Sequence, residues 1–97
     1  MFTNPRYITH GVQAEVSAGL QGFLWFLIET MAGKPDCLQV FHLEPRGGKQ
    51  HITHIQEGPP YQREYDIDIG RDEKPVTAKL FVIDDADHST MLLACEY

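Results

Sequence analysis

Residues 17–31 read SAGLQGFLWFLIETM and contain the strongest helix signal of the chain. From residue 16 to residue 31, apolar side chains recur at the spacing of an amphipathic helix; they are Val16, Leu20, Phe23, Leu24, Leu27, Ile28 and Met31. Ser17 is a suitable N-cap, and Gly33 followed by Lys34-Pro35 is a conventional stop. The pattern therefore predicts one helix with a wide apolar face, which a second layer must cover.

On both sides of this helix the apolar period changes to two, which is typical of strands. We expect strands over residues 7–12, 37–44, 50–57, 61–69, 76–83 and 89–97. Most connections are short and favour antiparallel pairing, because parallel neighbours need a longer crossover. The sequence predicts an α+β fold: one amphipathic helix packed on a mostly antiparallel five- or six-stranded sheet, with residues 1–97 as a single domain.

The cleanest alternation lies in residues 61–69. One face holds Tyr61, Tyr65, Ile67 and Ile69, and the other holds Gln62, Glu64, Asp66 and Asp68. Arg63 alone interrupts the apolar side. A strand with one wet, acidic face belongs to an antiparallel sheet with a solvated side.

The charge is uneven along the chain. The net charge is −6, from 8 Lys and Arg against 14 Asp and Glu, and residues 1–50 are neutral. The whole excess therefore lies in residues 51–97. Direct nucleic-acid binding is disfavoured, because it depends on Lys and Arg contacts to phosphates. A cationic partner, a metal ion, mimicry of DNA and a merely solvated surface all remain compatible.

The compartment follows from what the sequence lacks. No secretory signal is visible at the start, and the most apolar segment, residues 23–28, is far too short to span a membrane. We therefore expect a cytoplasmic protein. Cys37 and Cys95 have no metal or redox spacing, and we expect both to be small buried residues.

Two groups of residues are candidates for a metal site. Asp84, Asp85, Asp87 and His88 offer oxygen and nitrogen ligands to a divalent cation, although their spacing is not that of an EF-hand. The alternative is that these Asp side chains stabilise a tight turn.

Histidines form the second group. If Pro45 pairs with Lys49 in a hairpin, His42 and His54 lie diagonally on one sheet face, close enough for a zinc ion to bridge them. A one-residue bulge would place them on opposite faces. The alternative is that they are ordinary surface or cross-strand histidines.

Other catalytic patterns are missing. The sequence has no nucleophile elbow, no Walker A motif and no dinucleotide fingerprint, and we assign no general acid or base and predict no cofactor. Trp25 and Phe26 flank the apolar stripe of the helix. They either widen the core or form an exposed patch for a partner or a second copy of the chain.

Several motifs resemble the bacterial family called domain of unknown function 960. They include Arg6-Tyr7-Ile8-Thr9, Leu38-Gln39-Val40-Phe41, His54-Ile55-Gln56-Glu57 and Phe81-Val82-Ile83-Asp84-Asp85. The resemblance covers nearly the whole chain. It implies a cytoplasmic protein of Gram-positive bacteria, from a family found on mobile genetic elements and without an assigned activity. The chain departs from the family pattern at His10 and at Val16-Ser17.

Our leading interpretation is a small non-enzymatic protein-binding or accessory protein, with a protein partner at Trp25 and Phe26. One alternative is a metal-dependent hydrolase that uses residues 84–88, with or without His42 and His54. Another is an acidic inhibitor that imitates DNA through Asp66 and Asp68.

Overall fold

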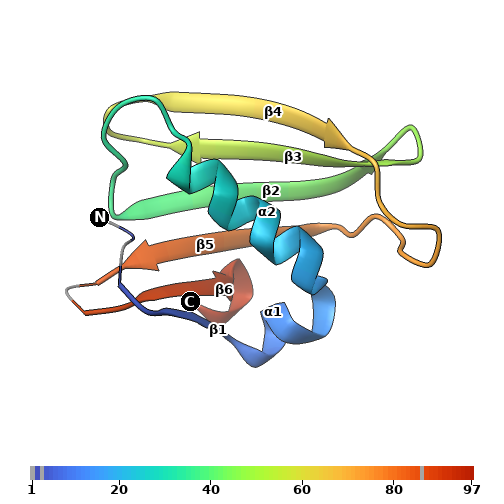
Figure 1. The fold of residues 1–97 in the computed structure, drawn as a ribbon, viewed down its shortest axis with the longest axis horizontal. Coiled ribbons are helices and arrows are strands. Elements are labelled where there is room, and N and C mark those ends of the chain that lie inside the picture. Colours follow the sequence, from blue (N-terminus) through green and yellow to red (C-terminus); the bar gives the residue numbers. More distant parts are fainter. Residues whose placement is uncertain (1, 3, 86) are drawn as a thin grey trace.

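A six-stranded sheet with α2 lying across one face forms the protein (Figure 1). The computed structural model describes residues 2, 4–85 and 87–97. In chain order the elements are β1 (Arg6–Ile8), α1 (His10–Glu15), α2 (Ala18–Glu29), β2 (Leu38–Arg46), β3 (Lys49–Gln56), β4 (Tyr61–Ile67), β5 (Ala78–Asp84), β6 (Ser89–Leu93) and the 3-10 helix η1 (Ala94–Glu96).

The strands lie in the order β1-β6-β5-β2-β3-β4. Every neighbouring pair is antiparallel except β1 and β6, which are parallel. The predicted α+β class and mostly antiparallel sheet are confirmed, with six strands. Strands β1 and β4 are the two edges.

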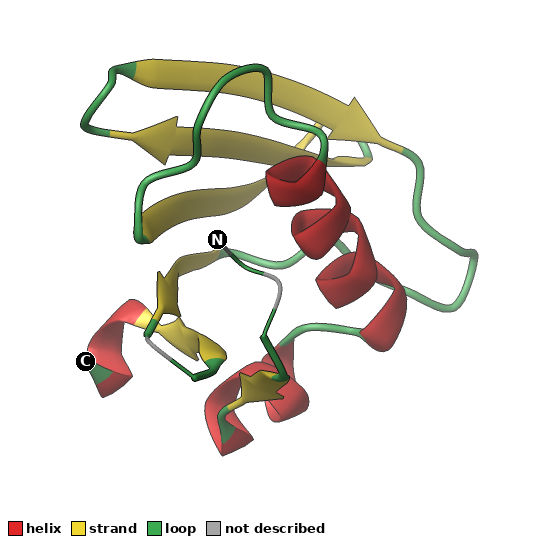
Figure 2. Cartoon of the chain, turned by 60° about the vertical axis from the view of Figure 1, so that its left-hand side comes forward, coloured by secondary structure: helices red, strands yellow, loops and turns green. Residues whose placement is uncertain are grey.

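The core lies between the sheet and the two helices. Figure 2 shows α2 against one sheet face, which we call the helix side; the opposite face is the helix-free face. The buried apolar side chains come from both layers: Val12, Val16, Leu20, Leu24, Trp25, Leu27, Ile28, Phe41, Leu43, Ile52, Leu80, Val82, Met91 and Leu93, together with Phe2. Ser17 caps α2 as expected, because its Oγ accepts a hydrogen bond from the Leu20 amide at 3.2 Å.

The predicted amphipathic helix is confirmed as α2, but the strand predicted over residues 7–12 is wrong beyond Ile8. Strand β1 ends at Ile8, and Thr9 caps a second helix, α1, by accepting a hydrogen bond from the Val12 amide. Val12 is fully buried in the core. A Thr N-cap and one buried apolar contact are enough to turn this short segment into a helix.

The predicted hairpin register is also wrong by one residue. Arg46 pairs with Lys49 across a two-residue turn, in which Gly47 and Gly48 have φ of 58° and 78°. Two positive φ values are the geometry of a tight hairpin turn that only glycine adopts without strain.

The cysteine prediction is wrong as well, since Cys37 and Cys95 are both exposed. Cys37 lies in the connection before β2, and Cys95 lies in η1, so both fall outside the layer that the helices cover.

Candidate protein-binding site

Strand β4 is an edge strand with a free side. Its seven residues pair with β3 from Gln56↔Tyr61 to Gln50↔Ile67, and no other described strand pairs with it. The Gly58-Pro59-Pro60 turn precedes it, so the strand begins where proline prevents a longer pairing. An edge strand presents unpaired backbone N–H and C=O groups that can hydrogen-bond to another chain.

The two faces of β4 differ sharply in chemistry. On the helix side, Tyr65 and Ile67 are half-buried and pack against the core, and the Tyr65 ring meets Phe23 of α2 edge-on at 6.2 Å. Successive side chains of a strand alternate, so Glu64 and Asp66 lie on the helix-free face. The edge therefore offers an apolar surface on one side and an acidic surface on the other.

A pocket lies where the end of β4 meets α2. Its volume is about 390 Å³, and its lining residues are Gly19, Leu20, Phe23, Ile67, Asp68, Ile69, Gly70 and Glu73. A Cβ atom placed on Gly19 would meet no other atom within 4 Å, so the glycine leaves space beside the helix. The pocket combines apolar walls with two carboxylates, and it lies at the end of the edge strand β4, where Ile67 lines it.

Phe26 extends the apolar surface along α2. Its side chain is 53% exposed, and its ring stacks on Phe23 at 6.2 Å. Trp25 is only 8% exposed, and the Arg6 guanidinium lies 4.7 Å from its ring centre. The sequence suggested one partner site that contains both aromatics, but the two side chains have different environments in the structure. Trp25 belongs to the core, whereas Phe26 is available to a partner.

The acidic face of β4 is anchored from within by His51 of β3. His51 Nδ1 lies 2.7 Å from Asp66 Oδ1, its Nε2 lies 3.0 Å from Glu64 Oε1, and the imidazole is 3% exposed. The hydrogen bond with Asp66 raises the pKa of His51 despite the opposing effect of burial. The sequence pattern does not predict this cluster, because recognising it requires the register that puts His51 opposite Asp66.

Comparison with known proteins places the chain in a family. The model of the family described as staphylococcal protein of unknown function (DUF960) matches residues 5–96. The chain belongs to this family. No curated protein matches it. The crystal structure of a protein of unknown function from Enterococcus faecalis is similar, with a TM-score of 0.83 and 24% identity over 97% of this chain and 91% of that chain. At this identity the likeness shows a shared fold alone.

In this member of the family, the predicted histidine pair does not form. His54 lies opposite Phe41, and His42 lies opposite Thr53, so the two imidazoles are on opposite faces of the sheet. His42 is exposed, whereas His54 is fully buried on the helix side. The proposal that one zinc ion bridges them is therefore wrong.

His54 belongs instead to a buried polar network. Its Nε2 donates to Gln39 Oε1 at 2.8 Å, and Gln39 Nε2 donates to Gln56 Oε1 at 2.6 Å. The imidazole stacks on Phe41 at 4.4 Å, and burial lowers its pKa to about 4. No substrate reaches a ring that is 0% exposed, so this histidine has a structural role.

The acidic loop at residues 84–88 has the contacts of a tight β-connection. Asp84 Oδ1 accepts from Ser89 Oγ at 2.7 Å, and the Asp85 amide donates to the His88 carbonyl at 2.7 Å. His88 Nδ1 lies 2.7 Å from Asp87 Oδ1, and this hydrogen bond raises the pKa of His88. Residue 86 is outside the described residues. Among those described, no group of three or more His, Cys, Asp or Glu side chains is arranged to hold a metal ion.

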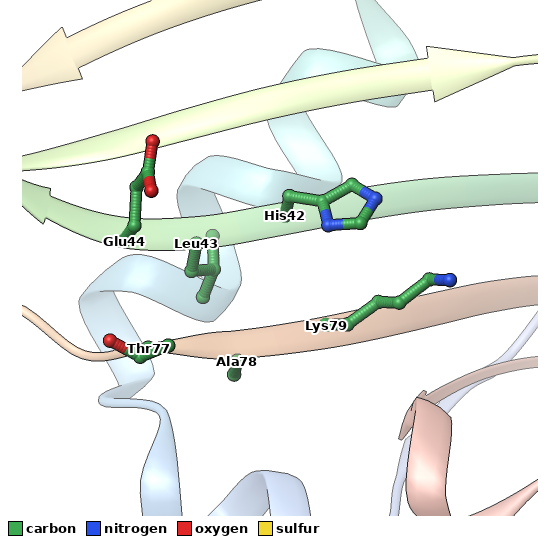
Figure 3. A pocket seen from close by; sticks show the side chains of 6 residues that line it. All are labelled: His42, Leu43, Glu44, Thr77, Ala78 and Lys79. Carbon is green, nitrogen blue, oxygen red and sulfur yellow. The ribbon is translucent and has the colours of Figure 1, made fainter.

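A second hollow lies on the helix-free face between β2 and β5 (Figure 3). Figure 3 shows His42 and Lys79 on neighbouring strands, with Glu44 further along β2. The remaining lining residues are Leu43, Thr77 and Ala78. This hollow has no strand edge beside it, so we place the candidate site at β4.

No helix in the part of the chain that the structure describes combines the length and apolar content needed to cross a lipid bilayer.

Proposed function

We propose that this protein is a non-enzymatic binding module, and that its protein partner adds an extended segment to the free edge of β4. The observation that carries the proposal is the partly apolar pocket at the end of this edge strand, where Ile67 of β4 and Phe23 of α2 both line it. In strand addition, backbone hydrogen bonds supply affinity, and side pockets for alternate side chains supply specificity. In this protein the free backbone groups of β4 and the pocket that Ile67 lines lie next to each other along the chain.

Two histidines of the sheet, His51 and His54, have shifted pKa values, and both are buried. Their burial supports a binding role over catalysis. The side chain of His51 is 3% exposed and that of His54 is 0% exposed. A general acid or base must come within hydrogen-bond reach of its substrate. Both histidines are enclosed by neighbouring side chains, and their altered pKa values follow from packing and internal ion pairs.

The test uses the full chain labelled with nitrogen-15. The probe is an eight-residue peptide that alternates threonine and valine, which is uncharged and extended. We expect saturable shifts of the amides of β4 and of α2 around Phe23. Shifts spread evenly over the protein, or none with this or any other alternating peptide, would overturn the proposal.

Filling the pocket gives a specific variant. Gly19→Trp places an indole in open space beside α2, so the fold is retained while the pocket is blocked. Ala18→Trp is the matched control, because Ala18 is an exposed residue outside the pocket lining. We expect Gly19→Trp to weaken peptide binding at least tenfold, which corresponds to about 1.4 kcal/mol, and Ala18→Trp to leave it unchanged.

A further inference from the structure

We infer that the segment which β4 captures alternates basic and apolar side chains, as an extended, positively charged strand of another protein. This inference rests on the proposed function and specifies the chemistry of its partner. It follows from the different environments on the two faces of the free edge.

The position of an added strand is set by sheet geometry. Neighbouring strands lie about 4.8 Å apart, and their side chains alternate between the two faces in step with the strand they join. Side chains of the partner on the helix side therefore point toward Tyr65, Ile67 and the pocket wall formed by Phe23. Apolar residues fit these positions.

Side chains of the partner on the helix-free face meet carboxylates instead. Glu64 and Asp66 are about half exposed, at 53% and 48%, and Asp68 just beyond the strand is 87% exposed. His51 contacts Glu64 and Asp66 from the inner side, at β3, and leaves their outer side to solvent. Lys49 lies 3.7 Å from Asp68 and is the one described lysine or arginine whose ion pair reaches this row. Lys or Arg side chains on the partner would form ion pairs with these carboxylates.

The same row argues against a second copy of this chain as the occupant. Two β4 strands paired edge to edge would bring two sets of carboxylates onto one face. Like charges directly opposite each other destabilise a strand pair. The charges of the edge thus select a basic partner over self-association.

Apolar anchoring is confined to one half of the edge. At the other half, Arg63 faces the helix side, and its guanidinium lies 5.0 Å from the ring centre of Tyr61. The pocket adjoins Ile67 and Asp68 at the far end. The strongest apolar contact of the partner therefore lies opposite the end of β4, and the rim carboxylates Asp68 and Glu73 favour a base beside it.

Three peptides of equal length test the inference on the full chain. They alternate lysine and valine, threonine and valine, or glutamate and valine, and binding is followed by the amide shifts of β4. We expect the lysine peptide to bind about tenfold more tightly than the threonine peptide, because a few partly exposed ion pairs each contribute a small amount. This advantage should shrink at high salt.

Charge reversal at the pocket rim supplies the variant. Asp68→Lys combined with Glu73→Lys should weaken the preference for the lysine peptide, because only Glu64 and Asp66 of the acidic face then remain. The control combines Asp72→Lys with Glu57→Lys, which changes the net charge equally at exposed positions outside the pocket. That control should keep the preference.

The outcomes separate the two proposals. Equal binding of all three peptides at β4 would overturn the basic-partner inference and leave strand capture standing. Binding of none of them would overturn both. Concentration-dependent self-association that shifts the same β4 amides without peptide would show that the occupant is a second copy, and would also overturn the inference.

Discussion

Acidification is expected to weaken the fold through one buried side chain, His54. Its imidazole is fully buried against Phe41, and burial lowers its pKa from 6.5 to about 4. The unfolded chain therefore takes up the proton first as the pH falls. The contribution of His54 to stability is complete above about pH 6.5, declines below it, and is lost once the pH falls through about 4.

The magnitude follows from the same two values. The difference between 6.5 and about 4 corresponds to about 3 kcal/mol at full effect, at about 1.36 kcal/mol per pH unit. We expect about 2 kcal/mol, because solvent screens part of a charge held in so small a domain.

Urea unfolding between about pH 7 and about pH 4 measures this contribution. His54→Phe retains an aromatic ring against Phe41 but cannot take up a proton. It loses the hydrogen bond to Gln39, so it starts less stable than the wild type at neutral pH. The difference in the free energy of unfolding between the wild type and His54→Phe should therefore shrink by about 2 kcal/mol on acidification.

A matched control isolates the charge from the hydrogen bond. Gln39→Leu removes the same hydrogen bond and keeps His54. The free energy of unfolding of this variant should therefore still fall on acidification, as it does in the wild type. A deficit of His54→Phe that stays constant over this pH range would refute the reasoning.

Other perturbations have equally definite outcomes. Leu24→Ala should lower the free energy of unfolding by about 2–5 kcal/mol in urea titrations, because the Leu24 side chain is fully buried. Phe26→Ala should change it by less than about 0.5 kcal/mol, because the Phe26 side chain is more than half exposed. Gln50→Leu should cost about 2–3 kcal/mol in the same assay, since the Gln50 amide accepts from the Val76 N–H at 2.8 Å and donates to the Val76 carbonyl at 3.1 Å; an unchanged stability would show that these bonds are replaced by water. Glu96→Gln should speed hydrogen exchange in α1 but not in β3, because the carboxylate accepts bonds from Thr9 and Gly11.

The sequence was informative wherever one periodic pattern decided an element. The apolar stripe and the Ser17 cap predicted α2, and the alternation in residues 61–69 predicted the apolar and acidic faces of β4. The pattern did not reveal that β4 is an edge. Strand order depends on contacts between distant segments, and local periodicity carries no information on them.

The errors arose where a single residue changed the outcome. Gly47 and Gly48 form a two-residue turn instead of a longer loop, and this one-residue shift places His42 and His54 on opposite faces. The cluster at His51 depends on a different register, that of β3 with β4, and local periodicity does not give it. Short α1 was missed because six residues provide too few apolar repeats to distinguish a helix from a strand.

Pairing between β1 and β6 has a consequence for how the protein is made. The Glu96 carboxylate accepts a hydrogen bond from Thr9, which lies 87 residues away in the chain. Arg6 of β1 likewise pairs with Ser89 of β6. During synthesis β1 leaves the ribosome before β6, which follows it much later in the chain, and must wait for this partner. The hairpins β2–β3 and β3–β4 join neighbouring segments and can form as soon as they emerge, because closing a short loop costs little entropy. We therefore expect the acidic edge at β4 to be assembled while β1 and α1 are still without their partner.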